Sequence, residues 1–425
     1  MNITFTRAAT PTAPRVVITG LGVVSCIAIG KEQFLDALLA GRSGVTRITQ
    51  FDASRLPTRI AGEVQGFEFN GYVSRKRARQ LDRASRFGFV AAREAIGNSG
   101  IQFPFAEPHR VAIVVGSAIG GGVIKGLRYH DRIRERGPER ATPFFMIFSI
   151  DACAGYLAVE LGIHGPNLTV SSGCSSSANA LAVAFDLLRA GNADTALVCG
   201  VEAPLHETIM AMFCTSGILS TRNEDPELAC RPFASDRDGM VMAEGAGAVV
   251  LEVEEHARER KARVYAELAG YGTTCDPVSM GQVAPSPREM VNCMEAALSG
   301  CGHVPTEVGY VNAYANGSEY TDLLEAQALR EVFGDRVSAV AVSSTKSLVG
   351  HSLGASAVLE AVATVLAISE GVIPPSANCT NLDPECSFLD VVTSARKERV
   401  QVALKNSFSL GNRNTTLIFR KYWLP

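Results

Sequence analysis

The stretch NLTVSSGCSSSANALAVAFDLLRAG, residues 167–191, passes from a short apolar strand pattern into a helix pattern through a loop of serine and glycine. Its second part repeats apolar residues at the spacing of one helix face and ends at a glycine, which is typical of a helix terminus. Cys174 lies in the turn between the two elements. A strand, a loop of small residues and a helix in this order form one unit of an α/β protein.

The same alternation continues on both sides of this stretch. Helix patterns at 31–44 and 83–100 lie among apolar runs of strand length, and the chain closes on a strand pair at 400–422. The clearest strand patterns are RVVITGLGVV (15–24), RVAIVVG (110–116), TALVCGVEA (195–203) and VGYVNAYANG (308–317). They predict an α/β fold with largely parallel sheets. The two halves share this rhythm, but their sequences differ too much to establish a repeat.

Composition limits the class of protein. The chain has 425 residues, 47% of them hydrophobic, and a formal net charge of −3, so no general attraction to nucleic acid or an anionic membrane is expected. The N-terminal segment lacks the apolar core of a signal peptide, and no uninterrupted apolar run reaches the roughly 18 residues of a spanning helix. Eleven cysteines without a C-x-x-C pair or zinc-type histidine spacing indicate reduced thiols, no metal site and a cytoplasmic location.

Cys174 is the first candidate for chemistry. At the start of a helix, the macrodipole and the unpaired backbone N–H groups favour the thiolate, which is the nucleophilic form of cysteine. The same N–H groups can stabilise an oxyanion on a bound thioester. The alternative is a small buried cysteine with no chemical role. The surrounding serines and glycine leave room for a ligand and favour the nucleophile.

The segment STKSLVGHSLGA, residues 344–355, holds the second candidate pair, Lys346 and His351. The glycine before His351 and the run after it indicate a loop that leads into a helix, where an imidazole tends to stay neutral, and Lys346 would lower its pKa further. A capping histidine beside a solvated lysine is an equal alternative. The glycine-rich segments GSAIGGG (116–122) and NSFSLGNRN (406–414) match neither a dinucleotide fingerprint nor a Walker loop, and the first is interpreted as a simple turn.

Together these segments resemble the β-ketoacyl-acyl carrier protein synthases of the elongating, type II kind, the condensing enzymes of fatty acid and polyketide assembly. The motifs that carry the resemblance occur in the family's order: VVITGLGVVS, GRSGV, FDASRLPTRIAGEV, GPNLTVSSGCSSSANAL, ILSTRNEDPELACRPFASDRDGMVMAEGAGAVVLE, STKSLVGHSLGA and NSFSLGNRN. The resemblance implies a thiolase-like α/β fold, in which two similar halves, each with a mixed five-stranded sheet, form an α-β-α-β-α layered sandwich. The predicted parts are a flexible N-terminal arm (1–14), an N-terminal half (15–257, with Cys174) and a C-terminal half (258–425, with Tyr314, Lys346 and His351).

The resemblance also implies roles for individual residues. Cys174 would carry the acyl chain, His351 would assist decarboxylation of malonyl-carrier protein, and Lys346 would support the site. The backbone N–H groups of Cys174 and Leu410 would form the oxyanion hole, and Phe408 and Leu410 would lie on a gating loop. Phosphopantetheine would arrive with the carrier protein, so no metal and no cofactor of the enzyme's own is expected.

The segment VNAYANGSEYTD, residues 311–322, departs from the family pattern. Tyr314 takes the place of a second active-site histidine, while Asp322 still matches an acidic position. A phenol can donate a hydrogen bond, but with an ordinary pKa of about 10 it is a poor base at neutral pH. The final loop also differs and would place Arg413 near the site entrance, whereas Glu244 is interpreted as architectural.

Three functions remain open at this point. The chain is preferred as a working condensing enzyme of a specialised polyketide or polyene pathway, then as an acyltransferase or other coupling enzyme without decarboxylation, and last as a non-catalytic partner like a chain-length factor. An acidic acyl carrier protein would bind basic residues, for which Arg75, Lys76, Arg77 and Arg79 are candidates, although a solvated helix face is an equal alternative. A homodimer, or a heterodimer with a related ketosynthase or chain-length-factor subunit, follows by analogy with the fold.

Overall fold

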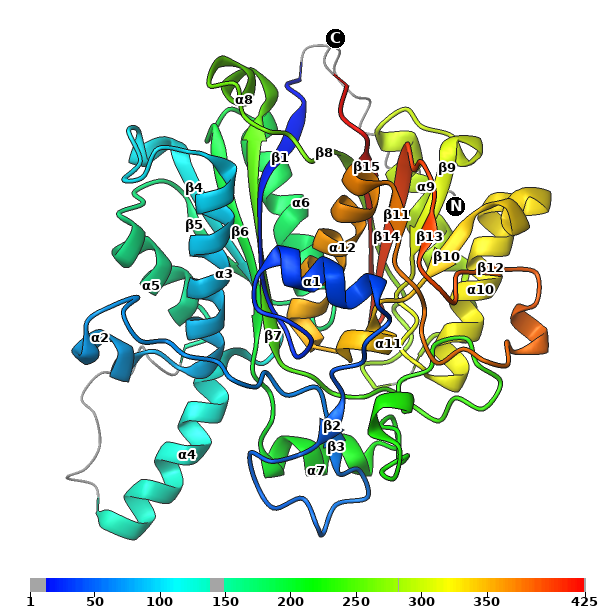
Figure 1. Cartoon of the computed structure of the whole chain (residues 1–425), viewed down its shortest axis with the longest axis horizontal. Helices are drawn as coiled ribbons and strands as arrows, with labels where there is room; N and C mark the ends of the chain where they lie inside the picture. Colours follow the sequence, from blue (N-terminus) through cyan, green and yellow to red (C-terminus); the bar gives the residue numbers. More distant parts are fainter. Residues whose placement is uncertain (1–12, 138–148, 282, 424–425) are drawn as a thin grey trace.

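The computed structural model describes residues 13–137, 149–281 and 283–423 (Figure 1). The flexible arm predicted at 1–14 therefore lies outside the described residues except for its last two positions. One continuous sheet of eleven strands dominates the described part, in the order β12-β10-β9-β14-β15-β8-β1-β7-β6-β4-β5. Its strands are β1 (Val16–Val24), β4 (Val111–Gly116), β5 (Asn167–Val170), β6 (Thr195–Glu202), β7 (Gly245–Val253), β8 (Ala266–Cys275), β9 (Val308–Asn312), β10 (Ala341–Ser343), β12 (Asp390–Val391), β14 (Val402–Ser409) and β15 (Arg413–Arg420).

The sheet consists of two sets of strands with matching connectivity. In the first set, β1 and β7 are antiparallel, β7 and β6 are antiparallel, and β6, β4 and β5 are parallel. In the second set, β8, β15, β14, β9 and β10 repeat this order and these directions. The two sets join where β1 pairs with β8, from Val16 opposite Leu268 to Ile18 opposite Ala266. The repeat that the sequences could not establish is therefore present in the strand order.

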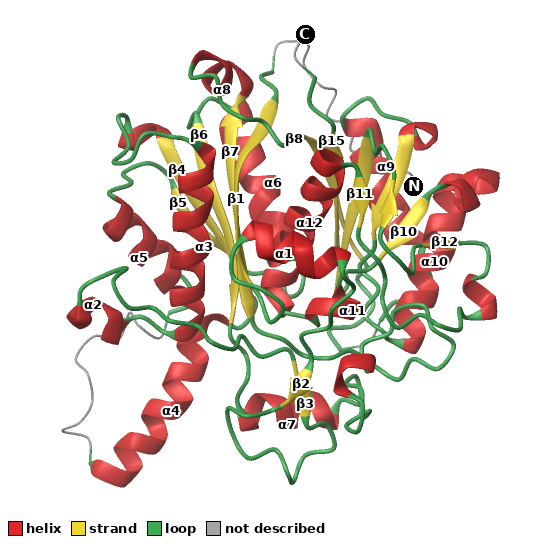
Figure 2. Ribbon diagram, in the orientation of Figure 1, coloured by secondary structure: helices red, strands yellow, loops and turns green. Residues whose placement is uncertain are grey.

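Helices cover the outer faces of the sheet and fill the space between its two sets of strands, which form two arms (Figure 2). The main ones are α1 (Lys31–Leu39), α3 (Arg83–Ser99), α4 (Gly120–Arg136), α5 (Ala152–Leu161), α6 (Ser176–Arg189), α7 (Glu207–Thr215), α9 (Arg288–Gly300), α10 (Glu319–Phe333) and α12 (Ser356–Glu370). Helices α6 and α12 pack against each other and against strands of both arms, while α3 and α5 cover one outer face and α9 and α10 the other. This is the layered α-β-α-β-α sandwich that the resemblance to the family implies.

Close approach between helix and strand requires glycine at two positions of β1. A Cβ atom at Gly22 would lie 1.9 Å from the Ala91 carbonyl oxygen, and one at Gly20 would lie 2.1 Å from the Ala95 carbonyl oxygen. The alternating glycines of the segment TGLG therefore let α3 lie directly on the strand. Every residue of β1 is buried, which agrees with its continuous apolar pattern.

The central helix layer, formed by α6 and α12, also contains the one stretch among the described residues that is long and apolar enough for a membrane-spanning helix. The segment Leu353–Glu370 is long and apolar enough to cross a bilayer, but 89% of it is buried inside the protein. A helix that is apolar on all sides is expected when protein surrounds it completely. The stretch is therefore the central core helix α12 and not a candidate anchor.

Candidate active site

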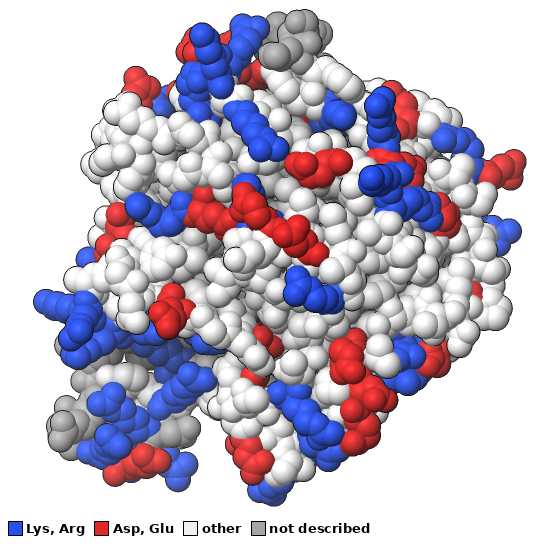
Figure 3. All heavy atoms as spheres, viewed as in Figure 1, with Lys and Arg blue, Asp and Glu red and all other residues white. Residues whose placement is uncertain are grey.

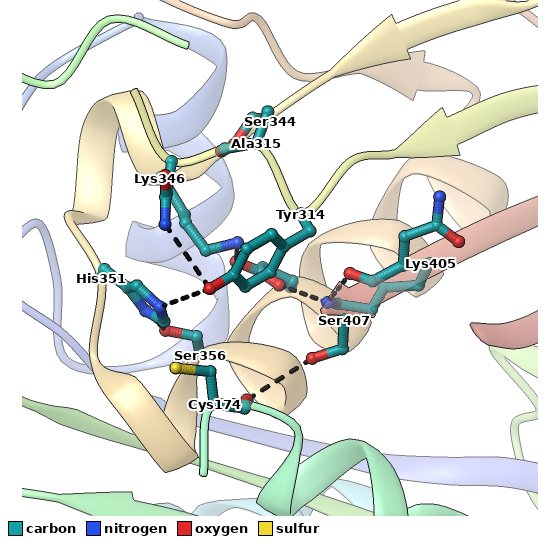
Figure 4. A network of polar contacts seen from close by, with 12 residues as sticks. Cys174, Tyr314, Ala315, Ser344, Lys346, His351, Ser356, Lys405 and Ser407 are labelled. Carbon is teal, nitrogen blue, oxygen red and sulfur yellow. Dashed lines mark hydrogen bonds and ion pairs between the residues drawn. The ribbon is translucent and has the colours of Figure 1, made fainter. Parts of the chain in front are cut away.

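A largely apolar cavity of about 210 Å³ lies between the two halves and contains Cys174 and Tyr314 on its wall. Residues from both halves line it, among them Phe213, Met290 and Leu410. Within the described part of the chain, His351 and Lys346 do not line this cavity, and both side chains are fully buried. Tyr314 therefore separates these two residues from the cavity, and its hydroxyl is directed toward both of them (Figure 4).

Cys174 lies in the loop between β5 and α6, as its sequence context predicts. Its backbone N–H donates to the Ser409 hydroxyl at 3.0 Å. Burial raises the pKa of the Cys174 thiol, while hydrogen bonds from the Tyr314 hydroxyl and the Leu410 N–H and the charge of Lys346 lower it. Burial is thus the largest influence on the acidity of Cys174, and the effect expected from the helix start stays a prediction.

Tyr314 follows β9 in a loop that two carboxylates hold in place. The N–H groups of Tyr314 and Ala315 donate to Glu325 at 3.0 and 2.7 Å, and Asp322 accepts from the next two N–H groups of the loop. The Tyr314 hydroxyl lies 3.3 Å from His351 Nε2 and 3.5 Å from Asn316 Nδ2. Burial raises the pKa of the phenol well above its ordinary value, so Tyr314 stays protonated and can act only as a hydrogen-bond donor or acceptor.

His351 lies behind Tyr314, with its ring nearly perpendicular to the tyrosine ring at 84°. Its Nδ1 is 2.8 Å from the Ser356 hydroxyl at the start of α12. Burial, with smaller contributions from Lys346 and Lys405, lowers the pKa of His351 well below its ordinary value. The neutral imidazole agrees with the sequence prediction, but burial and not the helix start is the main cause.

Lys346 belongs to a buried cluster of two lysines and one glutamate. Its Nζ pairs with Glu360 Oε1, while Lys405 Nζ lies 2.5 Å from Glu360 Oε2. The Lys346 ammonium also lies 4.6 Å from the centroid of the Tyr314 ring. Burial lowers the pKa of Lys405 to about 8. The alternative of a solvated lysine is wrong, since Lys346 has no exposed surface.

Sequence reasoning missed Lys405 and Glu360. Lys405 lies in the apolar strand pattern VALKNSF and Glu360 in the apolar helix pattern AVLEAV. A single charge inside an otherwise buried element is rare unless it is paired, and that pattern was the signal available. Nothing in the sequence indicates which charge pairs with which.

The final loop differs from its expected form. Phe408 is buried within β14 and is not part of a loop, with its ring centroid 6.0 Å from that of Tyr314. Leu410 is 43% exposed and lies in the short turn between β14 and β15. Arg413 begins β15, and within the described residues its side chain is not part of the cavity wall. Of the two residues expected on a gating loop, Leu410 lies outside a strand and Phe408 does not.

The segment GSAIGGG does bring backbone N–H groups to an anion, but the anion belongs to the protein. The N–H groups of Ala118 and Gly120 donate to the Glu202 carboxylate at 2.7 and 2.9 Å, and Gly354 donates to it at 3.1 Å. Burial raises the pKa of Glu202 to about 7. Glu202 therefore ties this segment to the loop that carries His351, and the interpretation as a simple turn is incomplete.

Glu244 accepts two hydrogen bonds from Arg83 and one from the Val64 N–H at 2.9 Å. These contacts agree with an architectural role. Among the described residues, no group of three or more His, Cys, Asp or Glu side chains could hold a metal ion.

A half-buried cysteine just before a central helix, between two half-folds of equal connectivity and beside a phenol and an imidazole, defines the class of thiolase-like condensing enzymes. A family model described as the N-terminal domain of β-ketoacyl synthase matches residues 13–257, and one described as its C-terminal domain matches residues 265–380. The chain therefore belongs to the β-ketoacyl synthase family.

Relatives cover nearly the whole chain. A 3-oxoacyl-[acyl-carrier-protein] synthase 2 of Synechocystis is 38% identical over 410 residues, which are 96% of this chain and 98% of that protein. A protein of the same description from Staphylococcus aureus is 36% identical over 409 residues, again 96% and 98% of the two chains. The homology thus extends through both halves of a ketosynthase, an enzyme of the acyltransferase class.

Solved structures agree in fold. A β-ketoacyl synthase from Burkholderia phymatum matches with a TM-score of 0.89 and 32% identity over 96% of this chain and all of that one. The ishigamide ketosynthase/chain length factor matches with a TM-score of 0.88 and 31% identity over 97% of this chain and 100% of that one. A type II polyketide ketosynthase solved in complex with its acyl-carrier protein matches with a TM-score of 0.89 and 28% identity, over 97% of this chain and 100% of that one. The thiolase-like fold is therefore confirmed.

Proposed function

We propose that this chain is a β-ketoacyl-acyl carrier protein synthase that takes an acyl group on Cys174 and condenses it, with loss of carbon dioxide, with a malonyl group on a carrier protein. The observation that carries the proposal is that Cys174 and Tyr314 line one cavity, with the Tyr314 hydroxyl hydrogen-bonded to the Cys174 thiol and 3.3 Å from His351 Nε2. No metal or resident cofactor takes part, because phosphopantetheine arrives with the carrier protein.

The first step transfers the acyl group to the enzyme. Cys174 Sγ bonds to the acyl carbon, the carbon–sulfur bond of the carrier thioester breaks, and the thiol proton ends on the released pantetheine sulfur. The Cys174 thiol must lose its proton during this step. The Tyr314 hydroxyl, the Leu410 N–H and the Lys346 charge all favour the thiolate and oppose the effect of burial.

The second step removes carbon dioxide from the malonyl group. Negative charge then develops on the thioester oxygen, and a donor beside that oxygen accelerates the reaction. If the Ser356 hydroxyl donates to His351 Nδ1, the imidazole carries its proton on Nε2 and donates to the Tyr314 oxygen. The Tyr314 proton is then free to point into the cavity. His351 is in this scheme a positioning residue that acts through Tyr314.

Condensation completes the cycle. The malonyl carbon freed of its carboxylate attacks the acyl carbon on Cys174, the bond from that carbon to Sγ breaks, and the released thiolate takes up one proton. The product is a β-ketoacyl group on the carrier protein. None of these steps needs Tyr314 as a base, which agrees with the raised pKa of its phenol.

A second candidate is acyl transfer without decarboxylation. It is favoured by the burial of His351 behind Tyr314, which leaves the phenol facing the cavity where an imidazole donor would otherwise act. The third candidate, a non-catalytic partner like a chain-length factor, is disfavoured because Cys174 lies on the cavity wall with its activating contacts in place. Tyr314 and Arg413 depart from the family pattern, and for this reason we favour a specialised polyketide or polyene pathway over fatty acid synthesis.

An acidic acyl carrier protein is the proposed partner. Helix α2 (Arg75–Gln80) exposes Arg75, Lys76 and Arg79, and lysine and arginine side chains gather over α2 and α4 on the face drawn in Figure 3. Arg77 differs from its neighbours because it pairs with Glu160 at 2.5 Å. The exposed cations suit a partner of opposite charge.

A second subunit, identical or of the related ketosynthase or chain-length-factor kind, is proposed at the edge strand β5. Within the described residues this strand pairs only with β4, so its other edge offers free backbone groups. Leu168 on β5 is 43% exposed, and Val159 on the neighbouring helix α5 is 64% exposed. Eleven free cysteines support a reducing, cytoplasmic setting for the assembly.

Mass spectrometry of the protein incubated with acyl- and malonyl-carrier proteins tests the proposal. We expect an acyl adduct on Cys174, release of carbon dioxide and a lengthened product, and no adduct on a Cys174→Ala variant. An adduct without carbon dioxide or product would replace condensation by acyl transfer. No adduct at all would support the non-catalytic partner.

A further inference from the structure

The Ser409 hydroxyl occupies the space beside the backbone of the nucleophile. Its oxygen accepts from the Cys174 N–H at 3.0 Å and donates to the Leu410 carbonyl at 2.9 Å. Ser409 is the last residue of β14 and is buried. The contact joins residues 235 positions apart, one from each half of the chain.

The same N–H group is a natural donor to an oxyanion formed on Cys174. It belongs to the nucleophile itself and lies just before α6, where backbone N–H groups have no partner within the helix. The Leu410 N–H hydrogen-bonds the Cys174 thiol and supplies a second donor. An acyl carbonyl oxygen that enters between the two groups would compete with the Ser409 hydroxyl for the first one.

Little space remains for both oxygens. A Cβ atom placed at Gly173 would lie 2.3 Å from Ser409 Oγ, so the hydroxyl rests directly against the loop that carries the nucleophile. Gly173 has a φ of +65°, which favours glycine and keeps this side of the loop free of a side chain. The hydroxyl therefore fills the place that a glycine at position 409 would leave open.

We propose that Ser409 is a positioning residue that keeps the oxyanion position of Cys174 occupied until an acyl thioester displaces its hydroxyl. The inference rests on the proposed acylation of Cys174. In the transfer, Sγ bonds to the acyl carbon, the donor thioester bond breaks and the thiol proton passes to the leaving sulfur. The carbonyl oxygen meanwhile takes the Cys174 N–H from Ser409.

Rotation of the serine side chain suffices for this exchange. The turn that follows Ser409 is held by three contacts: Asn412 N–H to the Ser409 carbonyl at 2.8 Å, Asn412 Nδ2 to the Ser279 carbonyl at 2.9 Å, and the Asp276 N–H to the Asn412 carbonyl at 2.9 Å. The backbone thus stays in place while the hydroxyl leaves. An exchange of one hydrogen bond for another slows the reaction without abolishing it.

The test compares two reactions of the same thiol in full-length protein. Acylation by hexanoyl-N-acetylcysteamine thioester needs the oxyanion position, whereas alkylation by iodoacetamide forms no oxyanion. For Ser409→Ala, we expect the limiting acylation rate at high pH to rise about three- to tenfold, the size of one exchanged hydrogen bond, while the limiting alkylation rate stays unchanged. The Ser409 hydroxyl also lowers the pKa of the thiol, so the alkylation profile should shift to higher pH in the variant.

Ser409→Thr keeps the hydroxyl, so its acylation rate should not rise. Ser409→Gly also lacks the hydroxyl and should show the same rise as Ser409→Ala, so it replaces the alanine variant if that variant folds poorly. Ser369→Ala, a change of the same kind on the distal end of α12, serves as the handling control and should behave as wild type. An acylation rate of Ser409→Ala that equals or falls below that of wild type would overturn the inference. A wild-type protein that takes no acyl group on Cys174 would instead refute the proposed function.

Discussion

Removal of the Tyr314 hydroxyl is the sharpest test of the proposed mechanism. In Tyr314→Phe the ring remains, so its contact with the Lys346 ammonium at 4.6 Å is kept. The hydroxyl lies at long hydrogen-bond distances of 3.3 Å from His351 Nε2 and 3.5 Å from Asn316 Nδ2, and it also hydrogen-bonds the Cys174 thiol. We therefore expect the variant to be less stable by no more than about 1 kcal/mol, the net value of one ordinary hydrogen bond.

The effect on the reaction should be much larger. Tyr314 lines the cavity and His351 does not, so the phenylalanine variant loses the phenol donor at this point of the wall without exposing the imidazole. Loss of one donor to a developing oxyanion lowers the rate roughly 10²–10³-fold, which corresponds to about 2.7–4 kcal/mol. Decarboxylation of malonyl-carrier protein should fall by this factor.

Acylation of Cys174 should respond differently. The Tyr314 hydroxyl lowers the pKa of the Cys174 thiol, so its removal raises that pKa and reduces the thiolate fraction at neutral pH. Acylation should slow a few-fold near pH 7 and recover as the pH rises through the higher thiol pKa. The pH profile therefore separates the effect on the nucleophile from the loss of the oxyanion donor.

The assay measures labelled carbon dioxide released from carboxyl-labelled malonyl-carrier protein, with acylation followed by intact-protein mass. Tyr310→Phe is the matched control, because its hydroxyl is also buried and hydrogen-bonded, to Ser343 at 2.9 Å, but lies away from the cavity. Its decarboxylation rate should equal that of wild type. Wild-type decarboxylation in Tyr314→Phe would refute the role given to the phenol.

Two further predictions concern buried and exposed charge. Lys405→Met should stabilise the protein at pH 7 by up to about 3 kcal/mol, because burial lowers the pKa of Lys405 from its ordinary 10.5 to about 8 and so makes its charged form costly in the folded state. A variant destabilised by about 3–5 kcal/mol, as is usual when a buried ion pair is broken, would contradict this. Between pH 8 and pH 10.5, Lys405 is mostly neutral in the folded protein and still protonated in the unfolded chain. The free energy of unfolding of wild type should therefore rise relative to that of the variant over this pH range, as measured by urea unfolding. Reversing the charges of Arg75 and Arg79 to Glu should raise the KM for carrier-bound acyl groups about tenfold and leave turnover of the N-acetylcysteamine thioester unchanged, with Arg399→Glu as a distant control. Equal KM values in steady-state assays would exclude α2 as the docking surface.

Local patterns were sufficient to predict the fold class and the position of the nucleophile. The strand β1, the helix α3 with its glycine end, and Cys174 in a turn between strand and helix follow from spacing and from small residues alone. Each of these features depends on residues that are close together in the sequence. The layered arrangement could be predicted only through the resemblance to a family.

Properties that depend on distant residues could not be predicted. The acidity of Cys174 is dominated by burial, which arises only when the two halves close around it. The pairing of Lys405 with Glu360 and the contact of Ser409 with Cys174 join segments that are far apart in the chain. The position of His351 behind Tyr314 likewise depends on how two loops of the C-terminal half fold onto each other.

The two central helices pack against each other near their first turns, close to the nucleophile and the histidine. Helix α6 begins just after Cys174 and α12 just after His351, and the Val358 N–H donates to the Ser177 hydroxyl at 3.0 Å where the helices meet. A Cβ atom at Gly200 on β6 would lie 2.5 Å from Val358 Cγ1 and 2.7 Å from Ser177 Cβ. The spacing between the two helix starts therefore depends on this close packing, and a methyl group added at Gly200, which is outside the cavity wall, would disturb it.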